Sequence, residues 1–380
     1  MNLLDLFQLI YKAGPRGMNV EALSGQFEGS RSTLNRRLSG MIADGSIRAI
    51  GVGRSTRYIS TTPFARETID AFFAKSWQER PAAMFMETLL DADINIGIER
   101  AHRMAQIQAL GQALDRRFLT RFLIDFTWGS SVLEGSTYTE LDTEALVRYG
   151  QKNQSKPTAD AVLALNHKQA AEFLWEHQDL TETNVCTMHS LLTSDHGLAE
   201  VADSDHFLGE HQRGKPREYE EVNLGASAYM PPFRPGTGFV QRSFGKIIET
   251  ANTLHPVQAA LFLMTRIPYL QAFANGNKRT SRIAANAPLL KAGLLPMSFA
   301  DTNKVDYIRG MAAFYELGSL HIIEQTFIRA YTKSILRSSN VPLSLRSAGF
   351  DLDGTAEALT DFVNSGRYPG DPDVAIFVSK

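Results

Sequence analysis

The stretch Gln271-Ala-Phe-Ala-Asn-Gly-Asn-Lys-Arg-Thr-Ser-Arg282 combines a glycine with three cations at the start of a predicted helix. Gly276 allows the backbone to approach a ligand closely, and residues Lys278 to Ala285 are predicted to open a helix whose free amides attract an anion. Arg279 and Arg282 lie three residues apart, so a helix places them on neighbouring parts of one face, where they would grip adjacent phosphates. The alternative is a solvated basic helix start, but cations there oppose the helix dipole.

This stretch resembles the signature loop of the Fic family, which runs His-Pro-Phe-x-Asp/Glu-Gly-Asn-Gly/Lys-Arg-x-x-Arg. The matching residues are Phe273, Gly276, Asn277, Lys278, Arg279 and Arg282. The resemblance implies a fold that binds ATP and, in most relatives, transfers AMP to a protein hydroxyl. It also implies that Gly276, Asn277, Lys278, Arg279 and Arg282 bind the nucleotide. Lysine at 278 occurs in the Doc branch, which phosphorylates its targets, so this residue alone does not select the reaction.

Two positions depart from the family pattern. Gln271 replaces the histidine that takes the proton from the attacking hydroxyl, and a carboxamide is neither basic nor titratable near neutral pH. A missing general base costs on the order of a hundred- to ten-thousandfold in rate. Asn275 replaces a carboxylate that holds Mg2+, and its neutral oxygen is a weaker ligand for that hard cation. We therefore expect ATP binding with weak or absent transfer, and weak binding of Mg2+.

A second motif, Ser130-Ser-Val-Leu-Glu134-Gly135, resembles the inhibitory helix of the family, Ser/Thr-x-x-x-Glu-Gly/Asn. A spacing of four residues places Ser130 and Glu134 on one helical face. A carboxylate in the last turn of a helix capped by Gly135 is electrostatically disfavoured, so it needs a cationic partner. Arg282 is the predicted partner, and this pair would compete with the terminal phosphate of ATP. The alternative is an ordinary surface acid at a helix end.

The segments between these motifs resemble the part of the family that ends in the flap, a short hairpin over the active site. They are Gly209-Glu-His-Gln-Arg213, Val222-Asn-Leu-Gly225 and Tyr229-Met-Pro-Pro232, and the implied flap residues are Tyr229, Met230 and Pro231. Such a flap docks an extended target segment by strand addition. The prolines here fit a plain surface loop equally well. His189 falls on a helix that relatives share, and we expect it to be structural rather than catalytic.

The whole chain has 380 residues, a hydrophobic content of 43% and a formal net charge of -2. This length is sufficient for two or three domains. The single cysteine, Cys186, excludes an internal disulfide and is typical of a reducing compartment. The longest apolar runs, such as Ala259 to Met264, are too short to span a bilayer, and the N-terminal segment lacks the pattern of a signal peptide. We expect a cytoplasmic protein without a membrane segment.

The first sixty residues form a basic module, with eight Lys/Arg against four Asp/Glu. The sequence predicts helices over 3–12, 20–27 and 32–44 and a hairpin over 47–60, an order that resembles a winged helix-turn-helix. Ser30 is expected to cap the third helix. The predicted DNA-binding residues on that helix and on the hairpin are Arg31, Ser32, Asn35, Arg36, Arg54 and Arg57. The alternative is a winged helix that binds protein or forms a dimer without touching DNA.

The predicted fold is mostly α. We expect a winged helix-turn-helix over 1–61, a helical connector over 62–93, a helical Fic-type domain with a small β-hairpin flap over 94–338, and a less regular C-terminal cap over 339–380. Within the cap, Asp351-Leu-Asp-Gly354 is expected to be a turn, because the downstream acids of a calcium loop are missing.

The expected function is an ATP-binding regulatory protein of the Fic type with weak or absent AMP transfer. We expect it to form a homodimer and to act through double-stranded DNA or a protein partner. Two alternatives stay open. The first is an active protein adenylyltransferase or phosphotransferase that modifies a protein hydroxyl. The second is a transcription regulator that uses the Fic fold only as a scaffold for dimerisation.

Overall fold

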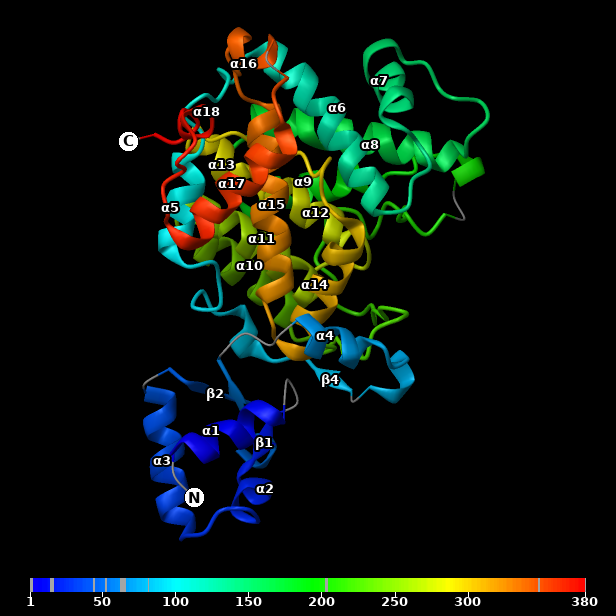
Figure 1. The fold of residues 1–380 in the computed structure, drawn as a ribbon. Coiled ribbons are helices and arrows are strands. Elements are labelled where there is room, and N and C mark those ends of the chain that lie inside the picture. Colours follow the sequence, from blue (N-terminus) through cyan, green and yellow to red (C-terminus); the bar gives the residue numbers. More distant parts are fainter. Residues whose placement is uncertain are drawn as a thin grey trace. The chain divides into compact units, whose positions relative to one another are not determined.

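The computed structural model describes residues 3–13, 17–43, 45–51, 53–61, 66–80, 82–201, 204–347 and 349–379. This part of the chain is mostly helical and contains two small sheets (Figure 1). The chain divides into two compact units, which are described separately below. The first comprises Met1–Asp91, Leu224–Met230 and Ile308–Ile323, and the second comprises Ala92–Asn223, Pro231–Tyr307 and Glu324–Lys380. Among the described helices, none has the length and apolar character needed to cross a membrane.

The described part of the first sixty residues contains three helices and a three-stranded antiparallel sheet. The helices are α1 (Leu3–Lys12), α2 (Val20–Ser24) and α3 (Arg31–Ala43), and the strands are β1 (Met18–Asn19), β2 (Ile47–Ile50) and β3 (Arg57–Ser60), in the order β1-β3-β2. Their core includes Leu6, Leu34 and Ile47. The Ser30 hydroxyl accepts a hydrogen bond from the Thr33 amide, as expected for an N-cap. The second helix ends at Ser24, earlier than predicted.

The rest of the first unit joins the connector to two later segments of the chain. It contains α4 (Arg66–Phe73), the 3-10 turns Trp77–Glu79 and Glu87–Leu90, the strands β4 (Ala83–Met84) and β5 (Tyr229–Met230), and the C-terminal part of α14 (Lys304–Leu317). Ile69 of α4 packs against Ala313 and Leu317 of α14.

The predicted β-hairpin at the flap does not form among the described residues. Instead, β5 pairs in parallel with β4, and Tyr229 and Met230 lie opposite Ala83 and Met84. Pro231 and Pro232 follow β5 directly, and proline has no amide to donate to a returning strand. A hairpin is therefore disfavoured here, and the connector supplies the partner strand.

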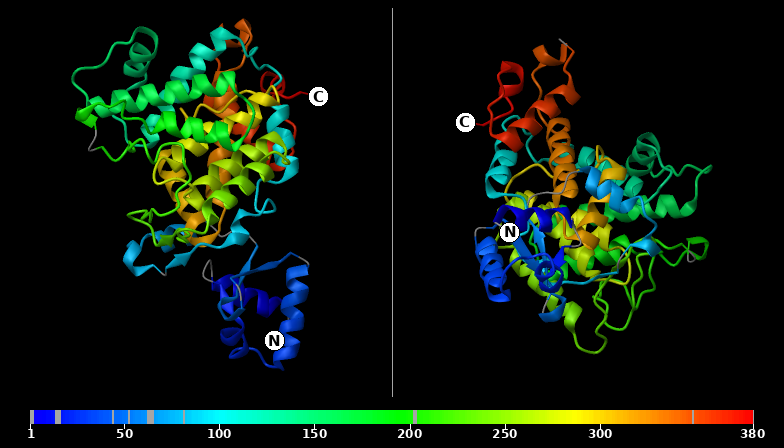
Figure 2. Two further views of the ribbon diagram at one scale, coloured as in Figure 1. Left: turned by 180° about the vertical axis from the view of Figure 1, so that it is seen from behind. Right: turned by 60° about the horizontal axis from the view of Figure 1, so that its bottom comes forward.

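The second unit is a set of helices packed around α11 (Pro256–Leu270), which lies among them in Figures 1 and 2. The other long helices are α5 (Ile98–Gln106), α6 (Arg116–Leu133), α7 (Glu140–Tyr149), α8 (Thr158–Glu176), α9 (Glu182–Leu192), α10 (Phe239–Ala251), α12 (Asn277–Ala284), α13 (Asn286–Lys291) and α15 (His321–Arg337). Nearly every residue of α11 is buried. Such a helix forms the centre of a core rather than an amphipathic edge.

The C-terminal segment is more regular than the sequence predicted. It contains α16 (Leu343–Ser347), α17 (Leu352–Ser365) and α18 (Pro372–Ala375). The expected turn at 351–354 is wrong, because these residues start α17. The Asp351 carboxylate accepts a hydrogen bond from the Gly354 amide at 3.1 Å, which is the bond of an N-cap. Leu359 and Val363 then anchor the helix, since both are fully buried.

Candidate functional site

The signature loop connects α11 to α12 through two residues in the left-handed region. Gln271 ends α11 with φ of 49°, and Gly276 precedes α12 with φ of 72°. A Cβ atom at Gly276 would lie 2.7 Å from the Thr193 side chain, so only glycine fits. Helix α12 begins at Asn277, and its first three amides have no acceptor among the described residues. Free amides at a helix start are the groups that attract an anion, and the anion site at this place stays a prediction.

The side chain of Gln271 is buried and bonded within the loop. Its Oε1 accepts a hydrogen bond from Asn277 Nδ2 at 2.9 Å, and its Nε2 donates to the Pro268 carbonyl at 2.6 Å. Asn277 also accepts from the Phe273 amide at 2.9 Å. The two amide side chains thereby hold the loop closed against the end of α11. Neither can take up a proton near neutral pH, so this loop contains no general base at position 271.

The predicted pair between the two motifs is present. Arg282 Nη2 lies 2.8 Å from the Glu134 carboxylate, and Arg282 Nε donates to the Ser130 hydroxyl at 2.9 Å. Tyr307 accepts from Nη1 at 3.3 Å. Glu134 follows the last residue of α6, and Gly135 turns the chain with φ of 98°. Every terminal nitrogen of this buried guanidinium thus has a partner.

The electrostatics of the pair favour its charged form. Burial by itself would raise the pKa of Glu134, but the charges of Arg282, Lys278 and Arg279 outweigh it and hold that pKa well below the usual range. The pKa of Arg282 is raised, because Tyr307 and Glu134 outweigh the effect of its burial. Both groups are therefore ionised at neutral pH, and a phosphate that binds Arg282 has to displace a carboxylate.

Arg279 differs from the expectation that it grips a phosphate beside Arg282. Its guanidinium donates to the Leu192 carbonyl at 2.9 Å and to the His206 carbonyl at 2.7 Å, and it is buried. Leu192 is the last residue of α9, where helix carbonyls lack partners within the helix. Arg279 therefore holds the chain around the loop. Lys278 is exposed and has no side-chain partner among the described residues, so it is the cation available to a ligand.

Asn275 does not provide a magnesium site. Its side-chain oxygen accepts a hydrogen bond from the Gly276 amide, and its side-chain nitrogen donates to the Asp205 carbonyl. No group of three or more His, Cys, Asp or Glu side chains with metal-binding geometry exists in the described part of the chain. An already bonded neutral oxygen is a poor match for Mg2+. The side chain of Asn275 therefore does not fit a magnesium ion.

His189 has the structural role that the sequence favoured. Its Nδ1 accepts a hydrogen bond from the Gly214 amide at 2.9 Å, so the proton lies on Nε2, which donates to the Asn275 carbonyl at 3.0 Å. The ring stacks on Phe273 at 3.9 Å between centroids. Burial lowers the pKa of His189 to about 3, so the ring is neutral. It supports the loop from α9.

Two residues beside the loop had no signal in the sequence. Arg217 is buried and donates to the Gln271 carbonyl at 2.6 Å and to the Pro232 carbonyl at 2.7 Å. Tyr307, from the first turn of α14, meets Arg282. Both belong to segments without a recognisable motif, so only the tertiary structure identifies them.

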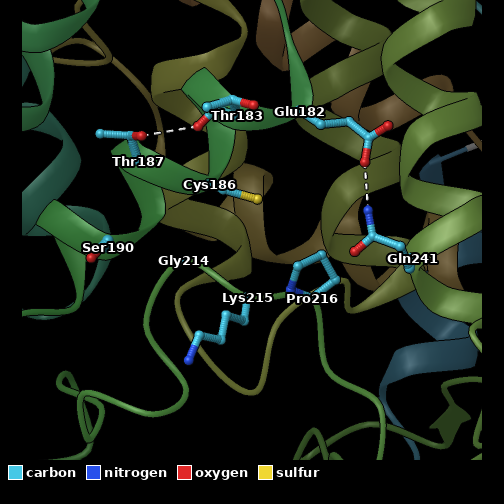
Figure 3. Close-up of a pocket in the computed structure, with 9 residues that line it drawn as sticks. All are labelled: Glu182, Thr183, Cys186, Thr187, Ser190, Gly214, Lys215, Pro216 and Gln241. Atoms are coloured by element: carbon cyan, nitrogen blue, oxygen red, sulfur yellow. Dashed lines mark hydrogen bonds between the residues drawn. The ribbon is translucent and has the colours of Figure 1, made fainter. Parts of the chain in front are cut away.

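A surface pocket of about 640 Å³ lies beside α9 (Figure 3). Its lining comes from α9, α10 and the turn at 214–216, and it contains none of the residues 271–282. Within it, Gln241 donates a hydrogen bond to Glu182. Burial and the nearby Glu182 raise the pKa of the Cys186 thiol to about 11, so this cysteine is a poor nucleophile. The residues of the signature loop therefore do not line this pocket.

Four of the predicted DNA-binding residues lie together on α3. Arg31, Ser32, Asn35 and Arg36 are all exposed on α3, whereas Leu34 and Leu38 on its other face are buried. Arg57 is exposed on β3, and its guanidinium donates to the Gly17 carbonyl at 3.2 Å. The side chain of Arg54 lies outside the described residues.

The loop before α12 thus combines a helix start that has free amides with the buried ion pair of Arg282 and Glu134. Residues 179–289 match the model of the Fic/DOC family.

The comparisons with individual proteins cover parts of the chain. It is 22% identical over 211 residues to the protein adenylyltransferase Fic of Nematostella vectensis, a match that covers 55% of this chain and 47% of the relative. The corresponding protein of Drosophila melanogaster is 26% identical over 92 residues, covering 24% of this chain and 19% of the relative. The chain therefore matches about half, or less, of the length of these relatives.

Two solved structures give matches of similar extent. Fic-1 of C. elegans matches with a TM-score of 0.46 and 17% identity, covering 66% of this chain and 70% of that one. A signaling protein of Bacteroides thetaiotaomicron that contains a Fic domain matches with a TM-score of 0.46 and 18% identity, covering 63% and 97%.

Proposed function

We propose that this chain binds ATP at the loop before α12 and regulates a partner, with AMP transfer that is weak or absent. The observation that carries this proposal is the state of Gln271, whose amide is bonded to Asn277 and to the end of α11. A general base at this position would have to accept the proton of a target hydroxyl, and a carboxamide has no such capacity. Binding requires only the free amides and the cations.

The proposed binding mode uses the start of α12. The free amides of Asn277, Lys278 and Arg279 take the inner phosphates, and the exposed ammonium of Lys278 adds a charge. Arg282 takes the outermost phosphate once Glu134 has released it. Glu134, with Ser130 and Gly135, is the proposed inhibitory element, because it already occupies the guanidinium that a third phosphate would need.

The N-terminal module is the proposed regulatory part. We propose that residues 1–61 are a winged helix-turn-helix and that the exposed face of α3 contacts a DNA duplex. The exposed residues Arg31, Asn35 and Arg36 suit phosphates and base edges. In this proposal the module is followed by a connector at 62–93, a Fic-type domain at 94–338 and a cap at 339–380. The protein also forms a homodimer, because two copies would raise the affinity for paired half-sites.

A second function is favoured by the names of the relatives. The proteins from Nematostella and Drosophila are called protein adenylyltransferases. In this alternative, the chain adenylylates a protein hydroxyl without a base from position 271. The two proposals differ in one product, a protein that carries AMP.

The experiment uses the purified full chain with ATP labelled at the α-phosphate. Calorimetry measures binding, and incubation with and without a cell lysate reveals transfer. Binding without labelled protein supports the first proposal, whereas a labelled target supports the second. No binding would refute both and leave a scaffold for dimerisation. Lys291→Ala is the control for charge, because Lys291 is exposed, lies outside the loop and pairs with Asp179.

A further inference from the structure

The pocket beside α9 is lined by three parts of the second unit (Figure 3). One face of α9 forms its longest side, because residues three or four positions apart share a face of a helix. The turn at 214–216 and Gln241 of α10 complete the lining. The residues from α9 are Glu182, Thr183, Cys186, Thr187 and Ser190. The row from 182 to 190 spans about 12 Å, since a helix rises about 1.5 Å per residue.

The pocket contains one acid and one base that have no ion-pair partner among the described residues. Glu182 accepts a hydrogen bond from the neutral amide of Gln241, and Lys215 is exposed. Glu182 is the first residue of α9. The turn that carries Lys215 packs against Cys186 and Ser190, which lie one and two turns further along the helix. The two charges therefore belong to different ends of the pocket.

The turn that carries Lys215 is held on both sides by hydrogen bonds. Before it, the Gly214 amide donates to His189 Nδ1 at 2.9 Å. After it, the Arg217 amide donates to the Ala272 carbonyl at 2.9 Å. This wall of the pocket is thus formed before a ligand arrives, and a preformed wall lowers the cost of binding.

The charges and the length of the pocket indicate the class of ligand. An anion alone would leave Glu182 without a partner, and a cation alone would leave Lys215 without one, whereas a zwitterion matches both. The hydroxyls of Thr183 and Ser190 have no hydrogen-bond partner in the described part of the chain, so they are available to amides and carbonyls. An extended chain spans about 3.3–3.6 Å per residue, so about three residues match the row along α9.

We propose that this pocket is a binding site for a zwitterionic ligand of the size of a free tripeptide. The ammonium of the ligand pairs with the carboxylate of Glu182, and its carboxylate pairs with the ammonium of Lys215. The hydroxyls of α9 bond to its amide groups. This site is distinct from the proposed nucleotide site, because the residues of the signature loop do not line the pocket.

The test titrates the full chain with trialanine, N-acetyl-trialanine and trialanine amide in a calorimeter. Trialanine should bind, and each blocked peptide should bind about two- to fivefold more weakly, which is typical of the loss of one partly exposed ion pair. Absence of trialanine binding would overturn the proposal.

Matched variants assign the two ends of the peptide. Glu182→Gln should weaken the binding of trialanine about two- to fivefold and leave that of N-acetyl-trialanine unchanged, because the acetylated end carries no charge. Lys215→Gln should act in the same way on trialanine and its amide. The control is Lys291→Gln, which removes the same charge outside the pocket and should change neither affinity. Equal losses for the free and the acetylated peptide in Glu182→Gln would overturn the assignment.

Cys186 locates the peptide by an independent measurement. It is the only cysteine of the chain, and it lines the pocket. Trialanine at about ten times its dissociation constant should slow the modification of Cys186 by methyl methanethiosulfonate about tenfold, because only the free fraction of the protein reacts. Mass spectrometry follows the adduct near neutral pH, where the peptide is a zwitterion. An unchanged rate in the presence of bound peptide would place the ligand elsewhere and refute the site.

Discussion

Arg282 Nη2 lies 2.8 Å from the carboxylate of Glu134, and this pair joins the end of α6 to α12. The two residues are 148 positions apart in the chain. Because Arg282 is also bonded to Ser130 and Tyr307, its guanidinium is fully engaged. The availability of this one side chain therefore depends on whether Glu134 stays in place.

The first prediction is that Glu134→Gly tightens ATP binding. Without the carboxylate, Arg282 is free to meet the outer phosphate, and coupling of this kind is commonly worth about 1–3 kcal/mol, or roughly five- to a hundredfold in affinity. Calorimetry of the variant and of the unaltered chain measures the difference. Arg282→Ala should weaken binding in both backgrounds, and more strongly when Glu134 is absent. Equal losses in the two backgrounds would show that the side chains do not compete for the same phosphate.

The second prediction separates the two neighbouring cations of α12. Arg279→Ala should lower the free energy of unfolding by roughly 1–3 kcal/mol, because the carbonyls of Leu192 and His206 lose their bonds to the guanidinium. Lys278→Ala should leave stability within about 0.5 kcal/mol, since the side chain is exposed. The same Lys278→Ala variant should bind ATP more weakly. Urea denaturation measures the stability of the two variants, and calorimetry measures their affinity for ATP. A large loss of stability in Lys278→Ala would contradict the exposed position of this side chain.

The third prediction concerns the chemistry at position 271. The triple variant Gln271→His, Asn275→Asp and Glu134→Gly should raise self-modification by at least about tenfold, since a general base alone contributes roughly a hundredfold where chemistry limits the rate. Each of the three single substitutions should raise self-modification by less than the triple variant does. Mass spectrometry detects the AMP adduct. Its absence from a triple variant that still binds ATP would mean that the triphosphate binds unproductively, whereas strong modification by the unaltered chain would make Gln271 a tolerated variant.

The fourth prediction tests the N-terminal module on DNA. Arg36→Ala should weaken duplex binding and reduce its salt slope by about one unit for the lost phosphate contact. Arg57→Ala should act in the same direction. The control on the same helix is Arg37→Ala, because Arg37 is half-buried over the ring of Phe27 and not on the exposed face. If selection from random duplexes enriches no sequence, the partner-binding alternative is favoured.

The fifth prediction is a dependence of stability on pH. His167 and His189 are buried, and burial lowers the pKa of each to about 3 from a usual value of 6.5. The unfolded chain therefore binds protons that the folded chain does not, so stability is lost as the pH falls from about 6.5 towards 3. Each histidine should contribute about 1–2 kcal/mol of that loss between pH 6.5 and 5. Urea denaturation of His189→Gln should show a shallower decline than the unaltered chain, and an identical decline would contradict the neutral buried ring.

Local patterns in the sequence were sufficient to predict the elements that carry the site. The helix that follows Gly276 and the first helix of the chain both appear close to their predicted bounds. The ion pair of Glu134 with Arg282 was also predictable. A carboxylate at a helix C-terminus needs a cation, and the resemblance supplied the one candidate.

The tertiary structure decided which polar groups are already occupied. Arg279 and Arg282 belong to one motif but have different partners. Arg279 donates to the backbone carbonyls of Leu192 and His206, whereas Arg282 pairs with the carboxylate of Glu134. Likewise, a two-residue strand at 229–230 has no pairing preference of its own. It pairs with residues 83–84 where Glu316 holds the preceding residues Ser227 and Ala228 by hydrogen bonds. Sequence periodicity specifies a local conformation, whereas partners brought together over long separations depend on the packing of the whole unit.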